Sequence, residues 1–395
     1  MKICFITDHP FSERDGEFYS GGGVPADMLY RYVRNDIQLY VVGRRTERSN
    51  TTLSSIPNSK FRLLRNYSSA LDGFTKRDKI RKELTEIISL ADGAVIRVPS
   101  GIANLASEVC KTLGRPYAIE VCGSAFDSLW NYGNIAGKLL APYNEHICRT
   151  IVRDAKYVLY VSQRDLQIEY PHREDAVTVA CSNVALDSNI KPEVLEERIR
   201  KIDEHQGDSY TIGQIGNLSV RYKGYKVALK ALKMVNDAGY DVSYAIVGGG
   251  EANNVINEAK KIKIDDKVII RGRMKHEEIS MFLQNIDVYV HPSFQEGVPR
   301  AVVEAMSYAV PCIASSAGGT GELLPKEWVH KPGDYKKLAA DILRMLGNKH
   351  RLKDASKANF EKAKEYYPNV LNERRTTYYD SFFKNISSYD RKKTI

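Results

Sequence analysis

The segment HPSFQEGVPRAVVEAMSYAVPCIASSAGGTGELL, residues 291–324, shows the alternation that decides the fold. It follows a short apolar run, Val288–Val290, which is typical of a buried strand. Pro299 is suited to the first turn of a helix, and we expect that helix over Arg300–Tyr308. A second apolar run, Cys312–Ala314, then predicts another strand. Strand, helix and strand in this order predict a parallel pair joined by a right-handed crossover.

The same alternation extends along both halves of the chain. In the second half we expect further strands at Tyr210–Gln214, Ser243–Val247 and Lys267–Ile270, and helices at Tyr225–Asn236, Ala252–Lys261 and Glu277–Gln284. In the first half we expect strands at Lys2–Thr7, Gln38–Val42, Ala94–Val98, Tyr117–Val121 and Tyr157–Val161, and helices at Ala26–Arg34, Lys76–Leu90, Ile102–Leu113 and Gly137–Ala155. Continuous apolar strands of this kind suit parallel sheets that are covered on both faces. The sequence therefore predicts an α/β protein with doubly wound sheets.

A polar stretch at residues 181–209 interrupts the alternation and marks a domain joint. We expect an N-terminal Rossmann-like domain at residues 1–184 and a C-terminal one at residues 185–369. The aromatic segment 370–395 is expected to form a helix that crosses back to the first domain. Because ligands of open α/β sheets bind at the carboxyl ends of the strands, a ligand would lie in a cleft between the two domains.

Composition indicates an ordinary globular protein. The chain has 395 residues, of which 43% are hydrophobic and 27% charged. It has no apolar run long enough to span a membrane, and the run Ile3–Ile6 is too short for a signal peptide. Its six cysteines lie far apart without a C-x-x-C pair, which favours a reducing cytoplasm over a disulfide scaffold or zinc site.

The formal net charge of +9 allows three kinds of anionic partner: a nucleic acid, a membrane surface or a phosphorylated substrate. We expect no nucleic acid, because the sequence contains no base-reading element. Between residues 60 and 82, eight basic side chains face two acidic ones, Asp72 and Asp78; the basic ones are Lys60, Arg62, Arg65, Lys76, Arg77, Lys79, Arg81 and Lys82. This run indicates either a solvated surface helix or peripheral docking to the anionic inner face of the cell membrane.

Two carboxylates define the candidate site in the second half. Glu296 lies in the loop before the expected helix, and Glu304 follows eight residues later within it. A helix N-terminus attracts phosphate through its free N–H groups, and Gly297 lets the backbone approach a ligand closely. Carboxylates there could accept hydrogen bonds from sugar and ribose hydroxyls. Taken alone, the pair could equally be one loop acid and one solvated helix acid.

The whole segment resembles the signature of family-4 retaining glycosyltransferases of the GT-B fold, P-S-x-x-E-G-x-P-x-x-x-x-E-A-M followed by G-G-x-x-E-L. The matching residues are Pro292, Ser293, Glu296, Gly297, Pro299, Glu304, Ala305, Met306, Gly318, Gly319, Glu322 and Leu323. The resemblance implies that Glu296 contacts the donor sugar and Glu304 the nucleotide ribose. It also implies that the backbone N–H groups of Gly297 and Val298 face the sugar or phosphate.

The segment Ile212–Leu232 also resembles the family, in which the corresponding loop holds the donor phosphates. It implies that Gly216 opens this loop and that Lys223 neutralises the diphosphate. The family usually has an arginine after this glycine, whereas Asn217 stands here, and Arg221 is the candidate for the missing charge. Further along, Arg273 and Met274 would lie beside the nucleotide base.

In the first half, the run Gly21–Gly23 resembles the family's N-terminal glycine loop, so Gly22 and Gly23 would lie against the donor phosphate. Cys122 and Gly123 occupy the place where many members have His-Gly. The acceptor-side candidates are Arg97, Cys122, Gly123, Ser124 and Asp127. Asp127 could instead cap a helix, and Arg97 could instead form a structural salt bridge.

The sequence contains no D-x-D motif, so we expect no metal and no other cofactor. The predicted function is a metal-independent, hexosyltransferase-type enzyme. It would move a sugar from a UDP- or GDP-linked donor to a saccharide or lipid-linked acceptor in cell-surface polysaccharide biosynthesis. Two alternatives stay open: a GT-B sugar-nucleotide epimerase, and a catalytically weak nucleotide-sugar-binding scaffold suggested by Asn217 and Cys122.

Overall fold

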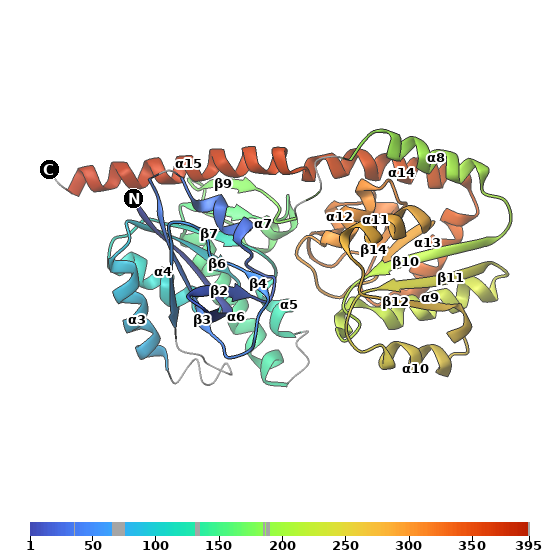
Figure 1. The fold of residues 1–395 in the computed structure, drawn as a ribbon, viewed down its shortest axis with the longest axis horizontal. Coiled ribbons are helices and arrows are strands. Elements are labelled where there is room, and N and C mark those ends of the chain that lie inside the picture. The colour runs from blue at the N-terminus through green and yellow to red at the C-terminus, as the bar shows by residue number, and fades with distance from the viewer. Residues whose placement is uncertain (35, 65–75, 131–134, 185, 187–189, 394–395) are drawn as a thin grey trace. The chain divides into compact units, whose positions relative to one another are not determined.

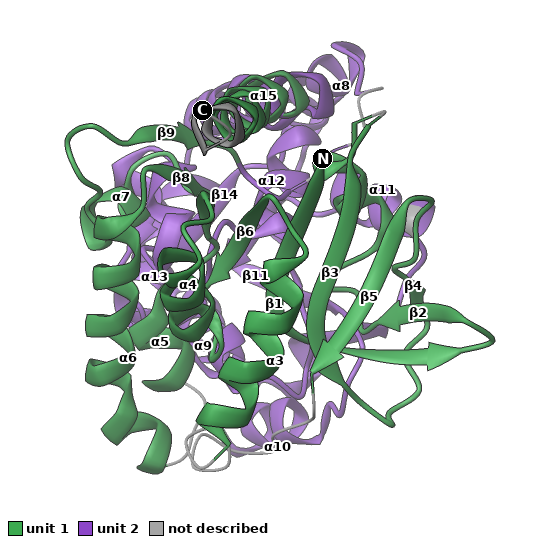
Figure 2. Ribbon diagram, turned by 90° about the vertical axis from the view of Figure 1, so that its left-hand side faces the viewer, with its two compact units in different colours: residues 1–181, 372–395 green, residues 182–371 purple. Residues whose placement is uncertain are grey.

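The computed structural model describes residues 1–34, 36–64, 76–130, 135–184, 186 and 190–393. The chain forms two compact units (Figures 1 and 2). Unit 1 contains Met1–Cys181 and Asn372–Ile395, and unit 2 contains Ser182–Leu371. Arg65 of the basic run and Ala185 of the predicted domain boundary lie outside the described residues.

The sheet of unit 1 has nine strands within the described residues. They are β1 (Lys2–Arg14), β2 (Glu17–Ser20), β3 (Gln38–Arg45), β4 (Thr52–Leu53), β5 (Ser59–Leu64), β6 (Gly93–Val98), β7 (Tyr117–Val121), β8 (Tyr157–Tyr160) and β9 (Val177–Ala180). Seven run parallel in the order β5-β3-β1-β6-β7-β8-β9. The second half of β1 pairs with β2, and β2 pairs with β4; both pairs are antiparallel.

Helices cover the sheet of unit 1. They are α1 (Ala26–Leu29), η1 (Tyr30–Tyr32), α3 (Arg77–Ser89), α4 (Ala103–Thr112), α5 (Ala125–Trp130), α6 (Ile135–Asp154), α7 (Asp165–Glu169) and α15 (Pro368–Lys393). Figure 2 shows α3, α4 and α6 side by side in front of the strands, and α4 contacts both neighbours.

Helix α15 is tied to unit 1 by aromatic side chains and by one buried carboxylate. Tyr379 of α15 and Tyr32 both donate hydrogen bonds to Oε1 of Glu120, which lies on β7 with 2% of its surface exposed. Phe382 and Ile386 are buried beside them. An aromatic stripe of this size removes a large apolar area from water, which holds the last helix on the sheet.

Unit 2 is a second parallel sheet with the order β12-β11-β10-β13-β14-β15. Its strands are β10 (Ser209–Ile215), β11 (Asp241–Val247), β12 (Val268–Gly272), β13 (Val288–His291), β14 (Cys312–Ser315) and β15 (Val329–His330). Its helices are α8 (Glu193–Glu204), η2 (Arg221–Lys223), α9 (Tyr225–Asp237), α10 (Asn253–Lys261), η3 (Asp265–Lys267), α11 (His276–Asn285), α12 (Arg300–Ser307), η4 (Gly318–Glu322), η5 (Lys326–Trp328), α13 (Tyr335–Leu346), α14 (Lys349–Ala363) and η6 (Lys364–Tyr366).

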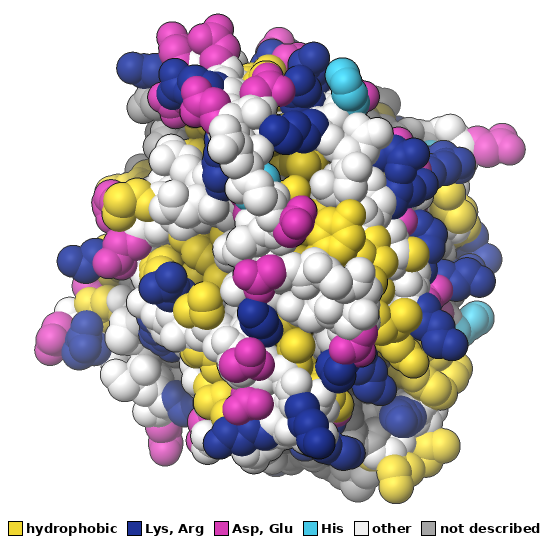
Figure 3. Space-filling view, turned by 90° about the vertical axis from the view of Figure 1, so that its right-hand side faces the viewer, with side chains coloured by type: hydrophobic (Ala, Val, Ile, Leu, Met, Phe, Trp, Pro, Cys, Tyr) yellow, Lys and Arg dark blue, Asp and Glu magenta, His cyan; other side chains and the backbone are white. Residues whose placement is uncertain are grey.

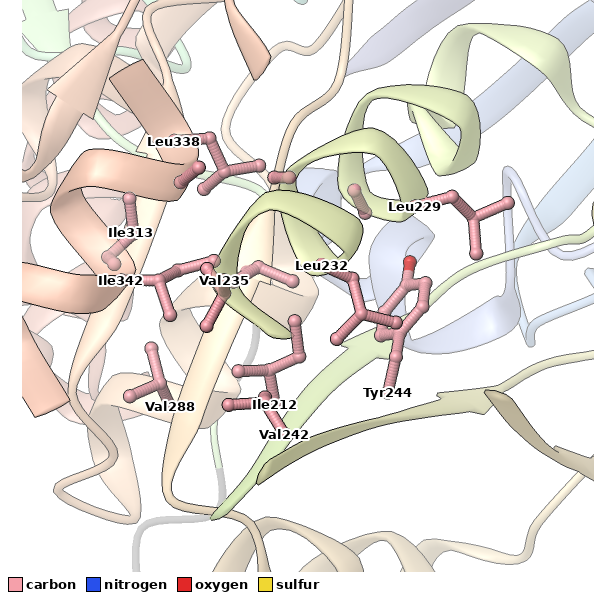
Figure 4. Packing of buried hydrophobic residues seen from close by; sticks show 14 of the residues in the cluster. Ile212, Leu229, Leu232, Val235, Val242, Tyr244, Val288, Ile313, Leu338 and Ile342 are labelled. Carbon is pink, nitrogen blue, oxygen red and sulfur yellow. The ribbon is translucent and has the colours of Figure 1, made fainter. Parts of the chain in front are cut away.

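The core of unit 2 lies on both faces of its sheet. Figure 4 shows the face where Leu232 and Val235 of α9 meet Ile212 of β10 and Ile342 of α13. On the other face, α11 and α12 pack against the sheet through residues such as Val303. A sheet covered on both sides explains why its strands are continuous apolar runs.

The predicted fold class, an α/β protein with two doubly wound domains, is confirmed. Three local features differ from the predictions. Helix α8 lies in the polar stretch that we expected to be a joint, where its charged surface hides the amphipathic pattern. Strand β1 continues past a bulge to Arg14 and pairs with β2, which was not predicted. The helix expected at Ala26–Arg34 ends at Leu29 and continues only as a 3-10 turn.

Candidate active site

The candidate site of unit 2 lies at the switch point of its sheet. Strands β10 and β13 are neighbours, yet β10 leads on to β11 on one side and β13 to β14 on the other. The crevice outside the carboxyl ends of such a pair is where open α/β sheets bind ligands. A pocket of about 420 Å³ lies there, lined by Ile215, Gly216, Lys223, Ile279, His291, Glu296, Pro299, Arg300, Ala301 and Glu304.

A glycine turn brings Lys223 to this pocket. Lys223 ends η2, and Gly224 follows in the left-handed conformation with φ +76°. A Cβ atom at Gly224 would lie 1.9 Å from the carbonyl oxygen of Pro292, so only glycine fits. The carbonyl oxygen of Tyr222 accepts hydrogen bonds from the N–H of Phe294 (2.7 Å) and the hydroxyl of Ser293 (2.9 Å). The turn that carries Lys223 is therefore joined to the loop that carries Glu296.

A second glycine turn supports the Glu296 loop from η4. Gly318 has φ +52°, and a Cβ atom there would lie 2.0 Å from the carbonyl oxygen of Glu296. The N–H of Gly319 donates to the carbonyl oxygen of Gly297 at 2.7 Å. The G-G-x-x-E-L turn of the sequence is therefore part of the site's framework.

Lys223, His291 and Glu296 form a compact charged group. Nζ of Lys223 lies 2.7 Å from Oε1 of Glu296, and Nε2 of His291 lies 2.8 Å from the same oxygen. Burial raises the pKa of Glu296, but His291 and Lys223 outweigh it, so the pKa falls from 4.5 to about 2. Glu296 is therefore ionised at neutral pH. His291 was not among the predicted site residues, although its place at the end of a strand was a usable signal.

Glu304 and the start of α12 form the opposite part of the pocket. Glu304 lies on the second turn of α12 and lines the same pocket as Glu296, as does Arg300 at the helix start. The structure therefore brings together four of the predicted residues: Gly216, Lys223, Glu296 and Glu304. A pocket that combines a cation, carboxylates and a helix N-terminus can hold a phosphorylated sugar through both its charge and its hydroxyls.

The other candidates of unit 2 lie around the pocket rather than among its lining residues. Asn217 is exposed, and its Oδ1 accepts a hydrogen bond from the N–H of Ser219 at 2.9 Å. Arg221 is exposed on η2. The two candidates after β12 have different surroundings. The exposed Arg273 lies against Gly249, whereas Met274 packs on the core.

The two residues after Glu296 help to hold the loop in place in this structure. Gly297 accepts the hydrogen bond from Gly319, and the side chain of Val298 packs on the core beneath α12. Neither is among the residues that line the pocket.

In unit 1, the glycine run connects β2 to α1. Gly22 has φ +95° and donates its N–H to Oγ of Ser20. Gly23 lies against the ring of His9, because a Cβ atom there would come within 2.7 Å of that ring. His9 lies within the bulge of β1, close to where the switch point of this sheet falls, between β1 and β6.

Arg97 makes the structural contacts that were the alternative to acceptor binding. Its Nε lies 3.5 Å from Oε2 of Glu120 and 3.3 Å from Sγ of Cys122. Burial raises the pKa of the Cys122 thiol even though Arg97 acts in the opposite direction, so the thiol is protonated at neutral pH. Arg97 and Cys122 therefore form one partly buried contact.

Ser124, rather than Asp127, caps helix α5. Oγ of Ser124 accepts a hydrogen bond from the N–H of Asp127 at 3.2 Å and donates to Glu169 at 2.6 Å. Asp127 is half-buried, and burial followed by the nearby Glu145 raises its pKa. Gly123 has open space beside it. Across residues 1–393, leaving aside the ranges that the structure does not describe, no group of three His, Cys, Asp or Glu side chains could hold a metal ion.

Comparisons with known proteins agree with this architecture. The model of the family described as glycosyl transferases group 1 matches residues 196–362. Protein CapJ of Staphylococcus aureus is 31% identical over 353 residues, which cover 88% of this chain and 87% of CapJ. The capsular polysaccharide biosynthesis glycosyltransferase CapM of the same organism is 26% identical over 199 residues, covering 48% of this chain and 50% of CapM. The crystal structure of Anabaena HepE in complex with UDP matches with a TM-score of 0.66 at 15% identity, covering 96% of this chain and all of that one.

The two doubly wound units give the chain the GT-B fold. The chain belongs to the group 1 glycosyl transferases.

Proposed function

We propose that this glycosyltransferase is a metal-independent, retaining enzyme of family 4 that transfers a hexose from a nucleoside diphosphate sugar. The observation that carries the proposal is the convergence of Lys223, Glu296 and Glu304 on one pocket at the start of α12. Lys223 would hold the diphosphate, Glu296 the hydroxyls of the sugar and Glu304 the ribose. The structure of HepE with UDP supports a uridine donor over a guanosine donor.

The chemistry follows from where charge develops. When the bond between the sugar and the diphosphate breaks, negative charge grows on the leaving phosphate. Lys223 and the N–H groups at the start of α12 would stabilise this charge in place of a metal ion. The leaving phosphate oxygen would take the proton of the acceptor hydroxyl on the same face of the sugar, so the anomeric configuration is retained.

The acceptor in this proposal is a saccharide or lipid-linked saccharide of a cell-surface polysaccharide. The similarity to CapM, whose name places it in capsular polysaccharide biosynthesis, supports this setting. The acceptor side belongs to unit 1, where Gly123 leaves open space and Asp127 is half-buried. No observation favours the epimerase. Both the matching family and CapM are glycosyltransferases by name.

We also propose that unit 1 contacts an anionic membrane from the cytoplasmic side. In the described part of the chain, no helix is both long enough and apolar enough to cross a membrane. Arg77 and Arg81 of α3 both pair with Glu108 of α4, which leaves fewer cations on α3 for lipid than the sequence suggested. On the face drawn in Figure 3, Lys and Arg are interspersed with Asp and Glu, so positive charge does not gather into a docking surface on that face.

The exposed face of α6 is the feature that supports membrane contact. Ile135 is 79% exposed, Leu139 76% and Tyr143 54%, and their spacing places all three on one side of the helix. Lys138 lies beside them and adds positive charge. Co-sedimentation with vesicles of anionic lipid should therefore exceed that with neutral vesicles and fall in Leu139→Asp. Ile168→Asp, a change at an equally apolar exposed side chain on α7, is the matched control, and equal losses in both variants would refute the contact.

The donor proposal is tested by thermal shift with UDP, GDP, ADP and their sugar conjugates, each with EDTA or with Mg²⁺. A ligand at 100 times its dissociation constant should stabilise the protein by about 2.7 kcal/mol. We expect a shift by one nucleotide class, of equal size with and without metal. Glu296→Ala should weaken the sugar conjugate more than the bare nucleotide, whereas Glu277→Ala on the exposed side of α11 should change neither.

A panel without any shift would refute the donor site and favour the scaffold alternative. A shift that requires Mg²⁺ would refute metal independence alone. Once a donor is known, the anomeric configuration of the product, measured by NMR, decides between retention and inversion.

A further inference from the structure

We propose that His291 is a positioning residue for the donor sugar. It holds one oxygen of the Glu296 carboxylate so that the other oxygen can accept a hydrogen bond from a hydroxyl of a nucleotide-linked sugar. This inference rests on the proposed function, because it assigns a role to a neighbour of the sugar-binding carboxylate.

The two oxygens of the Glu296 carboxylate differ in their contacts. Lys223 and His291 both bind Oε1 of Glu296, at 2.7 and 2.8 Å. Oε2 of Glu296 makes no hydrogen bond to any described residue, although Glu296 lines the pocket. A carboxylate has acceptor positions on both oxygens, so Oε2 is the atom that remains for a ligand.

His291 is buried with one of its two ring nitrogens unsatisfied by any described residue. Its side chain is 1% exposed, and its Nδ1 is buried without a hydrogen-bond partner in the described structure. A buried nitrogen without a partner is unfavourable, so packing alone would be better served by an apolar side chain. Among the residues that the structure describes, the ring makes one polar contact, to Glu296, and this contact requires the proton to be on Nε2.

Glu296 and a bound diphosphate would compete for the ammonium group of Lys223. In the structure Lys223 neutralises Glu296, but a bound diphosphate would attract the same ammonium group. Once Lys223 turns toward phosphate, His291 is the remaining side chain that holds Oε1. Its anchor is rigid, because His291 ends the central strand β13 and its ring lies parallel to that of Tyr289.

The test compares the dissociation constants of UDP and UDP-glucose, the ligands seen with HepE, by isothermal titration calorimetry. In His291→Leu we expect UDP-glucose to weaken about tenfold more than UDP, which corresponds to about 1.4 kcal/mol. His291→Gln should retain most of the wild-type ratio, because its amide N–H can donate to Oε1. His330→Leu removes another buried histidine of unit 2, at 3% exposure, and should leave the ratio unchanged.

A double-mutant cycle separates positioning from a general structural effect. If His291 acts through Glu296, then adding His291→Leu to Glu296→Gln should change the ratio by less than about twofold. An equal weakening of both ligands in His291→Leu, or an unchanged effect in the Glu296→Gln background, would overturn the positioning role and leave the donor site intact. If the wild-type protein binds neither ligand, the UDP-sugar proposal itself fails, and the role of His291 fails with it.

Discussion

The ionisation of Glu296 couples the site to the stability of unit 2, and this coupling can be measured. The pKa of Glu296 is about 2 in the folded protein, against 4.5 for the ordinary carboxyl. Since the folded value is lowered, the associated stability is fully present above pH 4.5 and is lost as the pH falls toward 2. Between pH 5.5 and 3.5 the unfolded chain takes up the proton while the folded chain does not. Over this interval the wild type should lose about 1.4 kcal/mol that Glu296→Gln does not lose.

The assay uses the two tryptophans, one in each unit. Trp328 is buried in unit 2 and Trp130 is 43% exposed in unit 1, so a Trp130→Phe background makes fluorescence report on unit 2. For a unit of this size, 1 kcal/mol moves the melting temperature by about 2–4 °C. The difference in melting temperature between Glu296→Gln and its parent should therefore shrink by about 3–6 °C as the pH falls from 5.5 to 3.5.

Glu277→Gln, an exposed change on α11, is the control and should follow the parent curve. If the difference between Glu296→Gln and its parent is the same at every pH, then the carboxylate is not held ionised by Lys223 and His291, and the electrostatic account of the site is wrong.

Three further predictions concern the framework. Gly224→Ala should destabilise unit 2 by more than about 2 kcal/mol in urea unfolding, because the new Cβ atom would strike the carbonyl of Pro292 at a positive φ; a neutral effect would show that the turn can relax. Ile342→Ala should cost about 2–5 kcal/mol in the same assay, because it opens a cavity in a fully buried core (Figure 4). Tyr379→Phe should lower the stability of unit 1 by about 1–3 kcal/mol, because Glu120 loses one of its buried donors; an unchanged midpoint would mean that the remaining contacts satisfy that carboxylate.

Much of the fold could be predicted from the sequence because the parallel strands are short apolar runs. Strand β7 was predicted with its observed bounds, and β10 and β13 to within one residue at each end. Helix α8 could not be predicted in the same way. It is held by Arg198, whose guanidinium donates to the carbonyl oxygens of Leu283 and Ile286 at the end of α11. Such a contact between distant segments leaves no local pattern in the sequence.

The candidate site shows the same division. The roles assigned to Glu296 and Lys223 came from a resemblance, and the structure places the two side chains in contact through turns that only glycine allows. His291 was overlooked because its one signal in the sequence was its place at the end of a strand, and the contact that explains its importance, to Glu296, is seen only in the structure. Arg97 has the salt bridge that the sequence left open as an alternative, because its partner Glu120 is 23 residues away on the neighbouring strand.

Unit 1 is discontinuous: its last helix follows the whole of unit 2 in the chain. During synthesis, the residues of unit 2 are therefore complete before those of unit 1, although unit 1 is started first. The aromatic side chains of α15 and the donor Tyr379 leave the ribosome only after the whole of unit 2, and until then they cannot cover Glu120 and the apolar surface around it. The usual order, in which the N-terminal domain folds first, is thus reversed for the final step of this protein. A nascent chain that stalls after residue 371 would carry the complete sequence of unit 2 attached to a unit 1 that lacks its last helix.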